Sequence, residues 1–459
     1  MFEELPIELT PEYTTAKIDE AIVLYEGEME IVQDANSWRG TGAIRFEWLP
    51  FSRVAMRFHS AEPNTHIELK PSKLRIRVFD FDSEADVNLT RVPFAFPGRA
   101  ADPAQGIVPQ IDCGESDCCA CLRFHIPNLP LWLGDPVRTQ EGGGALKRLS
   151  LRHAEWDITI DAIKFESREY QELKNSGGHG LTHVGTVTRR GGAPFSLTDC
   201  EPLLECISYF LSFCRGAWTR TILLSAEDKA GKIVGRRWTS DFVDRYKSTI
   251  SWVPSKEPAA ASIQSAFEGY ADAWFSGLWG EALRIVTQWY VESSTGAFEK
   301  SIVLMQAALE LFAWVRLVEE KQVLTKNDWK DKKNPFSSKL RSLLSHSSIP
   351  ILIPPDLSAL SAYCSAYQVP DGPEGITSIR NALVHPSPAK RARLKTHPGA
   401  LRDTWLLASW YLDLCMLNAC GYKGRYSNRT VRGVWAGDEV EAIPWSSTTL
   451  AASDAISDE

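Results

Sequence analysis

One short segment of the chain brings together an arginine, an asparagine and a histidine at helical spacing. It reads IRNALVHP at residues 379–386, so Arg380 and Asn381 are adjacent and His385 follows five residues after the arginine. On an ideal helix His385 lies roughly 140° beyond Arg380, with Asn381 between them. The apolar residues of the same turns fall on one face: Ile376, Ile379 and Leu383. The segment therefore presents three polar side chains along one arc beside a core face.

This set of side chains suits the cleavage of RNA without a metal or a cofactor. A ribose 2′-OH attacks its own 3′-phosphate, and a histidine can move the protons near neutral pH. An arginine and an asparagine can stabilise the extra negative charge on the phosphorane. We expect Arg380, Asn381 and His385 to yield a 2′,3′-cyclic phosphate and a 5′-hydroxyl. The alternative is a structural pair, because a histidine at a helix C-terminus interacts well with the helix dipole.

The spacing alone is weak, because an arginine precedes a histidine by five residues three times in the chain. The pairs are Arg148/His153, Arg341/His346 and Arg380/His385. The first lies in an alternating stretch, where its members would face opposite sides of a strand, and we interpret the second as a decoy or a supporting pair. Only the third is followed by a proline, Pro386, that ends a helix, and by a basic run. That run either binds flanking phosphates or is a solvated surface loop: Lys390, Arg391, Arg393 and Lys395.

The first half of the chain alternates apolar and polar residues, which is typical of strands with one buried face. The expected strands lie at 21–32, 43–49, 54–60, 66–71, 73–82, 121–127, 146–163, 181–190, 220–225 and 232–240. A helix at 199–215 interrupts them, preceded by the N-cap candidate Thr198. We expect residues 1–252 to form a β-rich domain, either a sandwich or a distorted barrel.

The periodicity becomes helical after a segment rich in Pro, Ala and Ser at 253–262. Helices are expected at 263–290, 297–321, 336–347, 356–367, 374–385 and 399–420, which gives an α+β protein with a helical domain at 262–425. The helix at 297–321 is apolar on nearly every side, so it must be covered all round, and a partner subunit is a natural cover. The acidic and polar tail at 446–459 is expected to be disordered.

Charge and composition limit the remaining possibilities. The 459 residues carry a net charge of −8, yet residues 321–432 hold 17 Lys and Arg against 7 Asp and Glu. A local basic field of this kind can hold a polyanion on an acidic protein. The start lacks the features of a secretory signal, and no run of about 18 apolar residues occurs. We therefore expect a cytoplasmic protein without a membrane anchor and with reduced cysteines.

One cysteine-rich segment could hold a metal. Four potential zinc ligands occur in it: Cys113, Cys118, Cys121 and His125. Their spacing fits no common zinc knuckle and leaves Cys119 over, so free thiols in a β-hairpin loop are favoured, and we expect no metal site. The carboxylates of the β-rich half leave open an enzyme acting on carbohydrate, but no pair has a defensible spacing.

Residues 297–420 resemble a HEPN domain (higher eukaryotes and prokaryotes nucleotide-binding). The ribonuclease motif of that family is an arginine, usually followed by a polar residue, and then a histidine, which matches Arg380, Asn381 and His385. The layout, a β-rich half followed by a helical domain carrying IRNALVHP, is similar to the ApeA-like HEPN proteins of bacteria, which resemble abortive-infection effectors that cut tRNA when a phage is sensed.

The resemblance implies an endoribonuclease that acts in antiviral defence, with RNA such as tRNA as its substrate. It also implies a homodimer whose arginines and histidines meet at a two-fold axis, and an acidic residue on the long helix, best matched by Glu310. Glu310 could instead be the buried ion-pair partner of Arg316 or Lys339. The β-rich domain would then sense a phage-derived trigger. The alternative is a HEPN scaffold that binds nucleotide or protein without cleaving.

Overall fold

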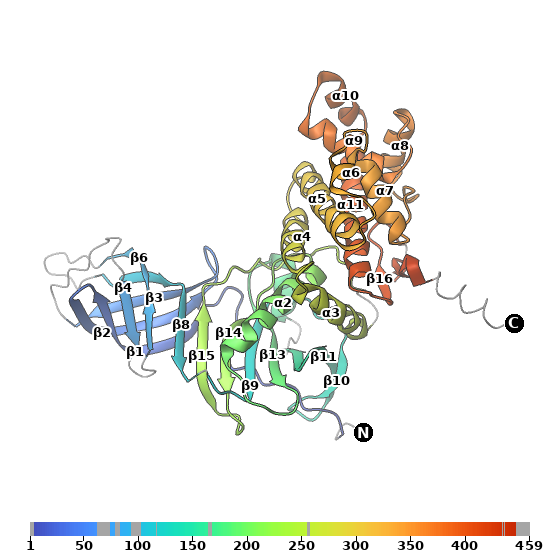
Figure 1. Cartoon of the computed structure of the whole chain (residues 1–459). Coiled ribbons are helices and arrows are strands. Elements are labelled where there is room, and N and C mark those ends of the chain that lie inside the picture. Colours follow the sequence, from blue (N-terminus) through green and yellow to red (C-terminus); the bar gives the residue numbers. More distant parts are fainter. Residues whose placement is uncertain are drawn as a thin grey trace. The chain divides into compact units, whose positions relative to one another are not determined.

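The computed structural model describes residues 4–61, 74–78, 83–92, 102–115, 117–163, 168–254, 258–433, 435 and 437–446. The chain forms two compact units. The first comprises residues 1–131, 136–208 and 218–248, and the second comprises residues 132–135, 209–217 and 249–459. The first unit is β-rich and the second is helical, so the protein has the expected α+β architecture (Figure 1).

The first unit begins with a seven-stranded antiparallel sheet in the order β5-β4-β1-β2-β3-β7-β6. Its strands are β1 (Ile22–Gln33), β2 (Asn36–Glu47), β3 (Arg53–Ser60), β4 (Leu74–Val78), β5 (Ser83–Asp86), β6 (Asn88–Arg91) and β7 (Ala104–Val108). Alternate side chains such as Met29, Ile31, Ile44 and Phe46 are buried, as period-2 patterning requires. The strand expected at 66–71 lies outside the described residues.

The same unit contains an eight-stranded antiparallel sheet in the order β10-β11-β12-β13-β9-β14-β15-β8. Its strands are β8 (Gln110–Gly114), β9 (Cys121–Pro127), β10 (Asp135–Arg138), β11 (Gly144–His153), β12 (Trp156–Ala162), β13 (Leu181–Arg189), β14 (Ile222–Glu227) and β15 (Ile233–Thr239). Two helices accompany it, α1 (Arg168–Ser176) and α2 (Leu197–Arg215). Side chains from both sheets share one core, among them Phe46, Phe58 and Trp238.

The N-terminal arm, residues 7–13, runs along the eight-stranded sheet without forming a strand of its own. The Leu9 N–H donates to Asp161 Oδ2 at 2.8 Å, and the Tyr13 N–H donates to His125 Nε2 at 3.2 Å. Glu12 accepts hydrogen bonds from Arg236, at 2.8 Å, and from Ser225. The arm therefore uses the polar side chains of the sheet as its hydrogen-bond partners.

The second unit is a helical bundle. Its helices are α3 (Ala259–Phe275), α4 (Gly280–Ser293), α5 (Phe298–Trp314) with the π-helical turn η2 (Val315–Glu320), α6 (Lys326–Lys330), α7 (Phe336–His346), α8 (Ser358–Ala366), α9 (Gly372–Val384), α10 (Pro388–Thr396) and α11 (Gly399–Ala419). A hairpin of β16 (Arg425–Ser427) and β17 (Val440–Ala442) and the short η3 (Pro444–Ser446) follow. Helix α5 packs against α4, α7, α9 and α11.

The second unit differs from the sequence prediction at α2 and at α3 and α4, and a further prediction falls outside the described residues. The single helix expected at 263–290 is broken into α3 and α4 around Gly277, where Ser276 adopts an extended conformation. The second half of α2, expected in the β-rich domain, belongs to the helical unit because Phe210 and Phe213 pack on Tyr270 and Tyr290. The tail expected to be disordered lies, from residue 447 onward, outside the described residues.

One stretch of the described residues, α5 with η2, is long and apolar enough to cross a membrane by length and composition. The most apolar 18-residue window of this 23-residue stretch has a mean hydropathy of 1.6, and 61% of that window is buried inside the protein. Since α5 packs against four other helices, its apolar character is that of an interior helix of this unit.

Candidate functional site

The N-terminal end of helix α9 is firmly anchored. Asp371 is its N-cap, and its Oδ1 accepts a hydrogen bond from the Glu374 N–H at 3.0 Å. The same carboxylate accepts two hydrogen bonds from Arg341 of α7, at 2.5 and 3.1 Å, and Arg341 also reaches Glu374 at 3.3 Å. These bonds raise the pKa of Arg341. Arg341, which belongs to the second of the three Arg/His pairs in the sequence, therefore helps to position α9.

Close packing holds the same end of α9 from the other side. The Gly372 N–H donates to the Ile351 carbonyl at 2.9 Å, and the buried Tyr411 of α11 donates to the same carbonyl at 3.2 Å. A Cβ at Gly372 would lie 2.3 Å from the Tyr411 hydroxyl and 3.1 Å from the Ile351 carbonyl oxygen. Only glycine fits there without displacement of its neighbours. Ile376 and Ile379 on the core face are fully buried, as predicted.

The C-terminal end of α9 carries the motif histidine. His385 is the C-cap residue, and its N–H donates to the Asn381 carbonyl at 3.0 Å. Its side chain is exposed, and the imidazole makes no hydrogen bond with the described residues. The ring is therefore accessible from solvent and has both nitrogen atoms available for proton transfer.

Arg380 and Asn381 lie next to each other one turn before the histidine, and both are half-buried. Arg380 Nη1 donates to Asn381 Oδ1 at 3.3 Å, and Arg380 Nε is buried without a partner among the described residues. No carboxylate in the described part of the chain forms an ion pair with this guanidinium. Its positive charge is therefore not neutralised by any carboxylate of the described residues, and an unpaired guanidinium of this kind can bind a phosphate.

The basic run after the motif forms helix α10, capped by Ser387, whose Oγ accepts from the Lys390 N–H at 3.3 Å. Lys390 Nζ lies 3.1 Å from the His385 carbonyl and 3.4 Å from that of Asn381, so it caps the last turn of α9. Arg393 lies over the Tyr367 ring at 4.5 Å. Arg391 and Lys395 are exposed, and their side chains form no hydrogen bond or ion pair with the described residues, so both charges are accessible to an anion.

Glu310 is exposed on α5, with no hydrogen bond or ion pair to the described residues. The ion-pair alternative is wrong, because Arg316 binds Glu320 and Asn418, and Lys339 donates to the Trp329 carbonyl. The surrounding stripe of α5 is only half-buried, and it consists of Val303, Ala307, Leu311 and Trp314. Helix α5 therefore keeps an apolar stripe that the described residues of the chain cover only partly.

The other two Arg/His pairs show different environments. Arg148 on β11 forms a bidentate pair with Asp161, at 2.7 and 2.8 Å, whereas His153 ends that strand opposite Trp156. His346 on α7 is exposed and bonds back to the Ser342 carbonyl at 2.8 Å. In both pairs the arginine is held by a carboxylate, Arg148 by Asp161 and Arg341 by Asp371.

The cysteine-rich segment does not assemble a metal centre in the described part of the chain. Cys119 donates to the Phe195 carbonyl at 3.1 Å, and His125 is buried beneath Tyr13. Burial raises the pKa of the Cys113 and Cys121 thiols to about 11 and about 12. All of these cysteines are free thiols, but the expected β-hairpin is wrong, because β8 with Cys113 pairs with β15 whereas β9 with Cys121 pairs with β13 and β14.

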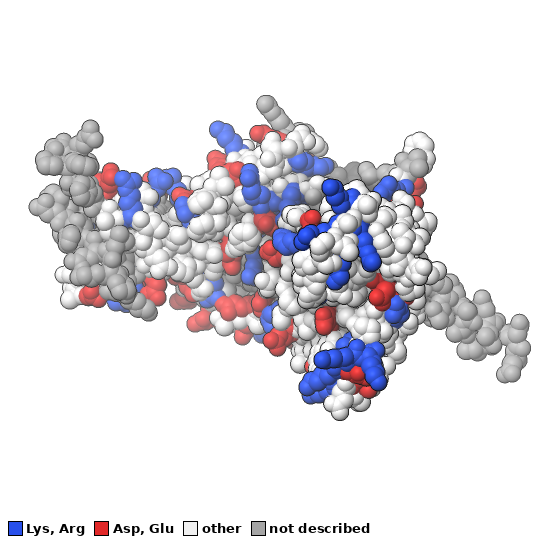
Figure 2. All heavy atoms as spheres, turned by 90° about the horizontal axis from the view of Figure 1, so that it is seen from above, with Lys and Arg blue, Asp and Glu red and all other residues white. Residues whose placement is uncertain are grey.

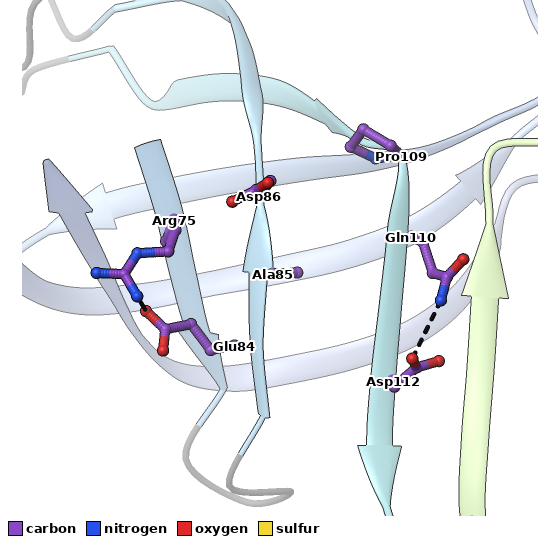
Figure 3. A pocket seen from close by; sticks show the side chains of 7 residues that line it. All are labelled: Arg75, Glu84, Ala85, Asp86, Pro109, Gln110 and Asp112. Carbon is purple, nitrogen blue, oxygen red and sulfur yellow. Dashed lines mark hydrogen bonds and ion pairs between the residues drawn. The ribbon is translucent and has the colours of Figure 1, made fainter. Parts of the chain in front are cut away.

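A pocket of about 480 Å³ lies in the β-rich unit, where β5 meets β8 (Figure 3). It contains three carboxylates, Glu84, Asp86 and Asp112, but Arg75 binds Glu84 at 2.6 Å and Gln110 donates to Asp112 at 3.1 Å. Asp112 also pairs with Arg237 at 2.5 Å. Because its charged groups bind one another, this pocket offers less to a ligand than the end of α9.

Sequence comparisons find two regions of similarity. Residues 114–249 match the family described as the YopA central domain, and residues 276–441 match the YopA C-terminal domain. The chain is similar to the SPbeta prophage-derived uncharacterized protein YopA of Bacillus subtilis (strain 168), with 29% identity over 306 residues. These residues are 65% of this chain and 66% of that protein, so the chain spans just under two thirds of this relative. No solved structure matches the chain.

Proposed function

We propose that the chain is a metal-independent endoribonuclease whose reacting groups are Arg380 and His385 at the C-terminal end of α9. The observation that carries this proposal is a contrast between the two ends of α9. The N-terminal end is fixed by Asp371 and Arg341, whereas at the C-terminal end the Arg380 guanidinium and the His385 imidazole have no ion-pair partner among the described residues. A rigid support with free reacting groups is what a catalytic constellation needs. His385 moves the protons, and Arg380 with Asn381 stabilises the phosphorane.

The distribution of charge supports an RNA substrate. Residues 321–432 carry 17 Lys and Arg against 7 Asp and Glu. Figure 2 is seen from the side on which α10 lies in Figure 1, and it shows basic side chains gathered on the helical unit. Arg391 and Lys395 of α10 follow the motif directly and are free to contact phosphates on either side of the cut.

A second copy of the chain would complete the site. The half-buried stripe of α5, with Val303, Ala307 and Leu311, is the surface that we propose pairs across a two-fold axis. Glu310 lies beside this stripe and would then lie at the interface between the two copies of α5. We expect the wild type to sediment as a dimer and Ala307→Arg to sediment as a monomer with an unchanged circular dichroism spectrum. A wild type that is monomeric at every micromolar concentration would contradict the pairing.

The setting that we propose is cytoplasmic defence against phage, with tRNA as one substrate and the β-rich unit as the sensor of a phage-derived trigger. The similar protein of Bacillus subtilis is prophage-derived, which supports a link to phage biology. Expression in a bacterial host with and without phage, followed by sequencing of RNA ends, tests this setting. Cuts confined to one RNA class would identify the substrate, and unchanged RNA in both conditions would contradict the defence role.

The direct test of the activity is RNA cleavage by the purified chain in excess EDTA. Bulk tRNA and a labelled single-stranded RNA are the substrates, and the variants are Arg380→Ala, His385→Ala and His346→Ala. We expect a loss of about 10²- to 10⁴-fold for His385→Ala and of about 10²- to 10³-fold for Arg380→Ala. His346→Ala is the matched control, because this exposed histidine lies in the same sequence spacing, and it should retain wild-type activity.

Two outcomes would remove the nuclease assignment. Equal cleavage by the wild type and both motif variants would mean that the activity comes from elsewhere. Intact RNA with every protein would favour the alternative function, a scaffold that binds nucleotide or protein without cutting.

A further inference from the structure

A second candidate site lies in the helical unit, in a pocket of about 410 Å³. One wall is residues 427–433, which are the last residue of β16 and the loop after it, together with Trp435. The opposite wall comes from the first turns of α11, with Arg402 and Leu406, and from Leu357 before α8. No residue of α9 or α10 lines it, so this pocket is separate from the motif.

A buried ion pair anchors the loop. Arg429 donates from Nε to Asp413 Oδ2 at 2.7 Å and from Nη2 to the Tyr290 hydroxyl at 2.7 Å. The side chains of Arg429 and Asp413 are 1% and 0% exposed. Burial raises the pKa of Asp413, although Arg429 opposes this shift. Burying such a pair is costly, and removing either partner would leave the other charge buried and unpaired. Here the pair fixes the position of a surface loop.

Further hydrogen bonds hold the loop on both sides of Arg429. Asn428 Nδ2 donates to Glu441 Oε1 at 3.0 Å, and Asn428 Oδ1 accepts from the Thr430 N–H at 2.9 Å. The Arg432 N–H donates to Asp356 Oδ2 at 2.7 Å. The loop is thus preorganised, which is a property of binding sites that must present side chains in one arrangement.

The lining combines cations with exposed apolar surface. Arg432 is exposed, with no side-chain partner among the described residues, and Arg402 lies 3.6 Å from the adjacent Asp403, whose Oδ2 is occupied by N–H groups of α8. The Trp435 side chain is 78% exposed and Ile250 is 42% exposed. Glu439 also lines the pocket, but its Oε2 accepts from the Gly437 N–H at 3.0 Å.

This chemistry selects a ligand with a phosphate and a flat ring. Two arginines suit a phosphate because each offers a planar set of donors. An exposed indole gives a surface on which a base stacks. The volume lies within the range of small-ligand pockets. We propose that this pocket binds a nucleoside monophosphate, with the phosphate held by Arg402 and Arg432 and the base stacked on Trp435.

The test is titration of the full-length chain with AMP, followed by calorimetry and by tryptophan fluorescence. Adenosine and inorganic phosphate are separate arms, and we expect each to bind at least tenfold more weakly than AMP. Arg402→Gln and Arg432→Gln should each weaken AMP binding at least tenfold. Trp435→Leu should weaken it about fivefold or more and abolish most of the fluorescence change. Arg152→Gln is the control, because this arginine is also exposed but lies in the β-rich unit.

Three results would overturn the assignment: AMP binding no tighter than phosphate, AMP binding unchanged in all three pocket variants, or AMP binding lost in Arg380→Ala. The site is independent of the nuclease proposal. If the protein binds AMP at this pocket but cuts no RNA, the nucleotide site stands and the nuclease proposal fails. If the protein cuts RNA but does not bind AMP, the nuclease proposal stands and the nucleotide site fails.

Discussion

The eight-stranded sheet and the C-terminal end of α9 treat the same residue types in opposite ways. In the sheet, His125 and His183 are buried, and burial lowers their pKa values to about 4 and about 3. Arginines there are paired, as Arg148 is with Asp161. At the end of α9, His385 is exposed and Arg380 bonds only to the neighbouring amide of Asn381.

The difference separates structural histidines from those that can react. A histidine whose pKa is lowered to about 4 or about 3 stays neutral at pH 7 and cannot serve as an acid there, whereas the exposed imidazole of His385 is accessible to a substrate. Polar groups of the sheet bind the N-terminal arm. In α9 the polar groups at the N-terminal end are bound by neighbouring residues, whereas those at the C-terminal end are accessible to a ligand. The following predictions test this contrast, beginning with the largest effect.

Arg380→Lys keeps the charge but removes the planar set of donors. We expect cleavage to fall by about 10- to 100-fold, because a lysine cannot replace two parallel hydrogen bonds to a phosphate. Arg152→Lys in the β-rich unit should leave cleavage unchanged. Single-turnover rates at saturating protein measure the effect. Wild-type rates in Arg380→Lys would mean that only a point charge is needed.

Asp371→Ala removes the cap of α9 and leaves Arg341 with Glu374 alone. We expect the free energy of unfolding of the helical unit to drop by about 2 kcal/mol, the combined cost of a lost cap and a lost charged hydrogen bond. Urea denaturation measures this. Glu374→Gln, which alters the more exposed partner, should cost about 0.5 kcal/mol or less. Equal losses in both variants would contradict the anchoring role of Asp371.

Stability of the β-rich unit should depend on the buried histidines. Their pKa values are lower in the folded chain than the ordinary value of 6.5, so below pH 6.5 the unfolded chain binds more protons than the folded one. Stability is therefore lost as the pH falls from 6.5 towards 4, by at most about 1.4 kcal/mol per pH unit for each histidine. Urea melts at pH 7.5, 6 and 5 measure the slope, and His125→Gln should reduce it. A slope unchanged in this variant would place the proton uptake elsewhere.

Arg391→Gln and Lys395→Gln should weaken RNA binding by about two- to fivefold each and should lower its salt dependence, without changing the rate of the chemical step. Lys390→Gln should instead destabilise the last turn of α9, because Lys390 caps its carbonyl groups. Filter binding at several salt concentrations separates the two cases. An equal effect of all three substitutions on affinity would mean that α10 acts only as a diffuse positive charge.

Much of the helical unit follows from local signals in the sequence. The expected motif helix at 374–385 is α9 at Gly372–Val384, because an Asp-Gly-Pro start and Pro386 limit it. Helix α10 was not predicted, although Ser387 followed by Pro388 is an ordinary helix start.

In the β-rich unit, the stretch expected as one strand at 146–163 is the hairpin of β11 and β12. The turn of this hairpin uses Ala154 at φ +47°, and alanine gives no turn signal in the sequence.

The features that position the candidate site depend on tertiary contacts, and the sequence indicates these contacts less clearly than it indicates the helices. Arg341 and Asp371 are 30 residues apart, and nothing in their spacing indicates that they meet. The path of the N-terminal arm is fixed by single side chains such as Glu12 and His125, which lie far apart in the chain. Periodicity records which face of an element is buried, but not which element covers it.

The measurement that tests the central claim most directly uses the nucleophile of the RNA itself. The main cleavage position of the wild-type chain is first mapped in EDTA, and the same RNA is then made with a 2′-deoxy nucleotide on the 5′ side of that bond. Attack by the 2′-OH, assisted by His385 and Arg380, predicts that cleavage at this bond disappears and that the unmodified RNA ends in a 2′,3′-cyclic phosphate. Continued cutting at the deoxy position would contradict the account.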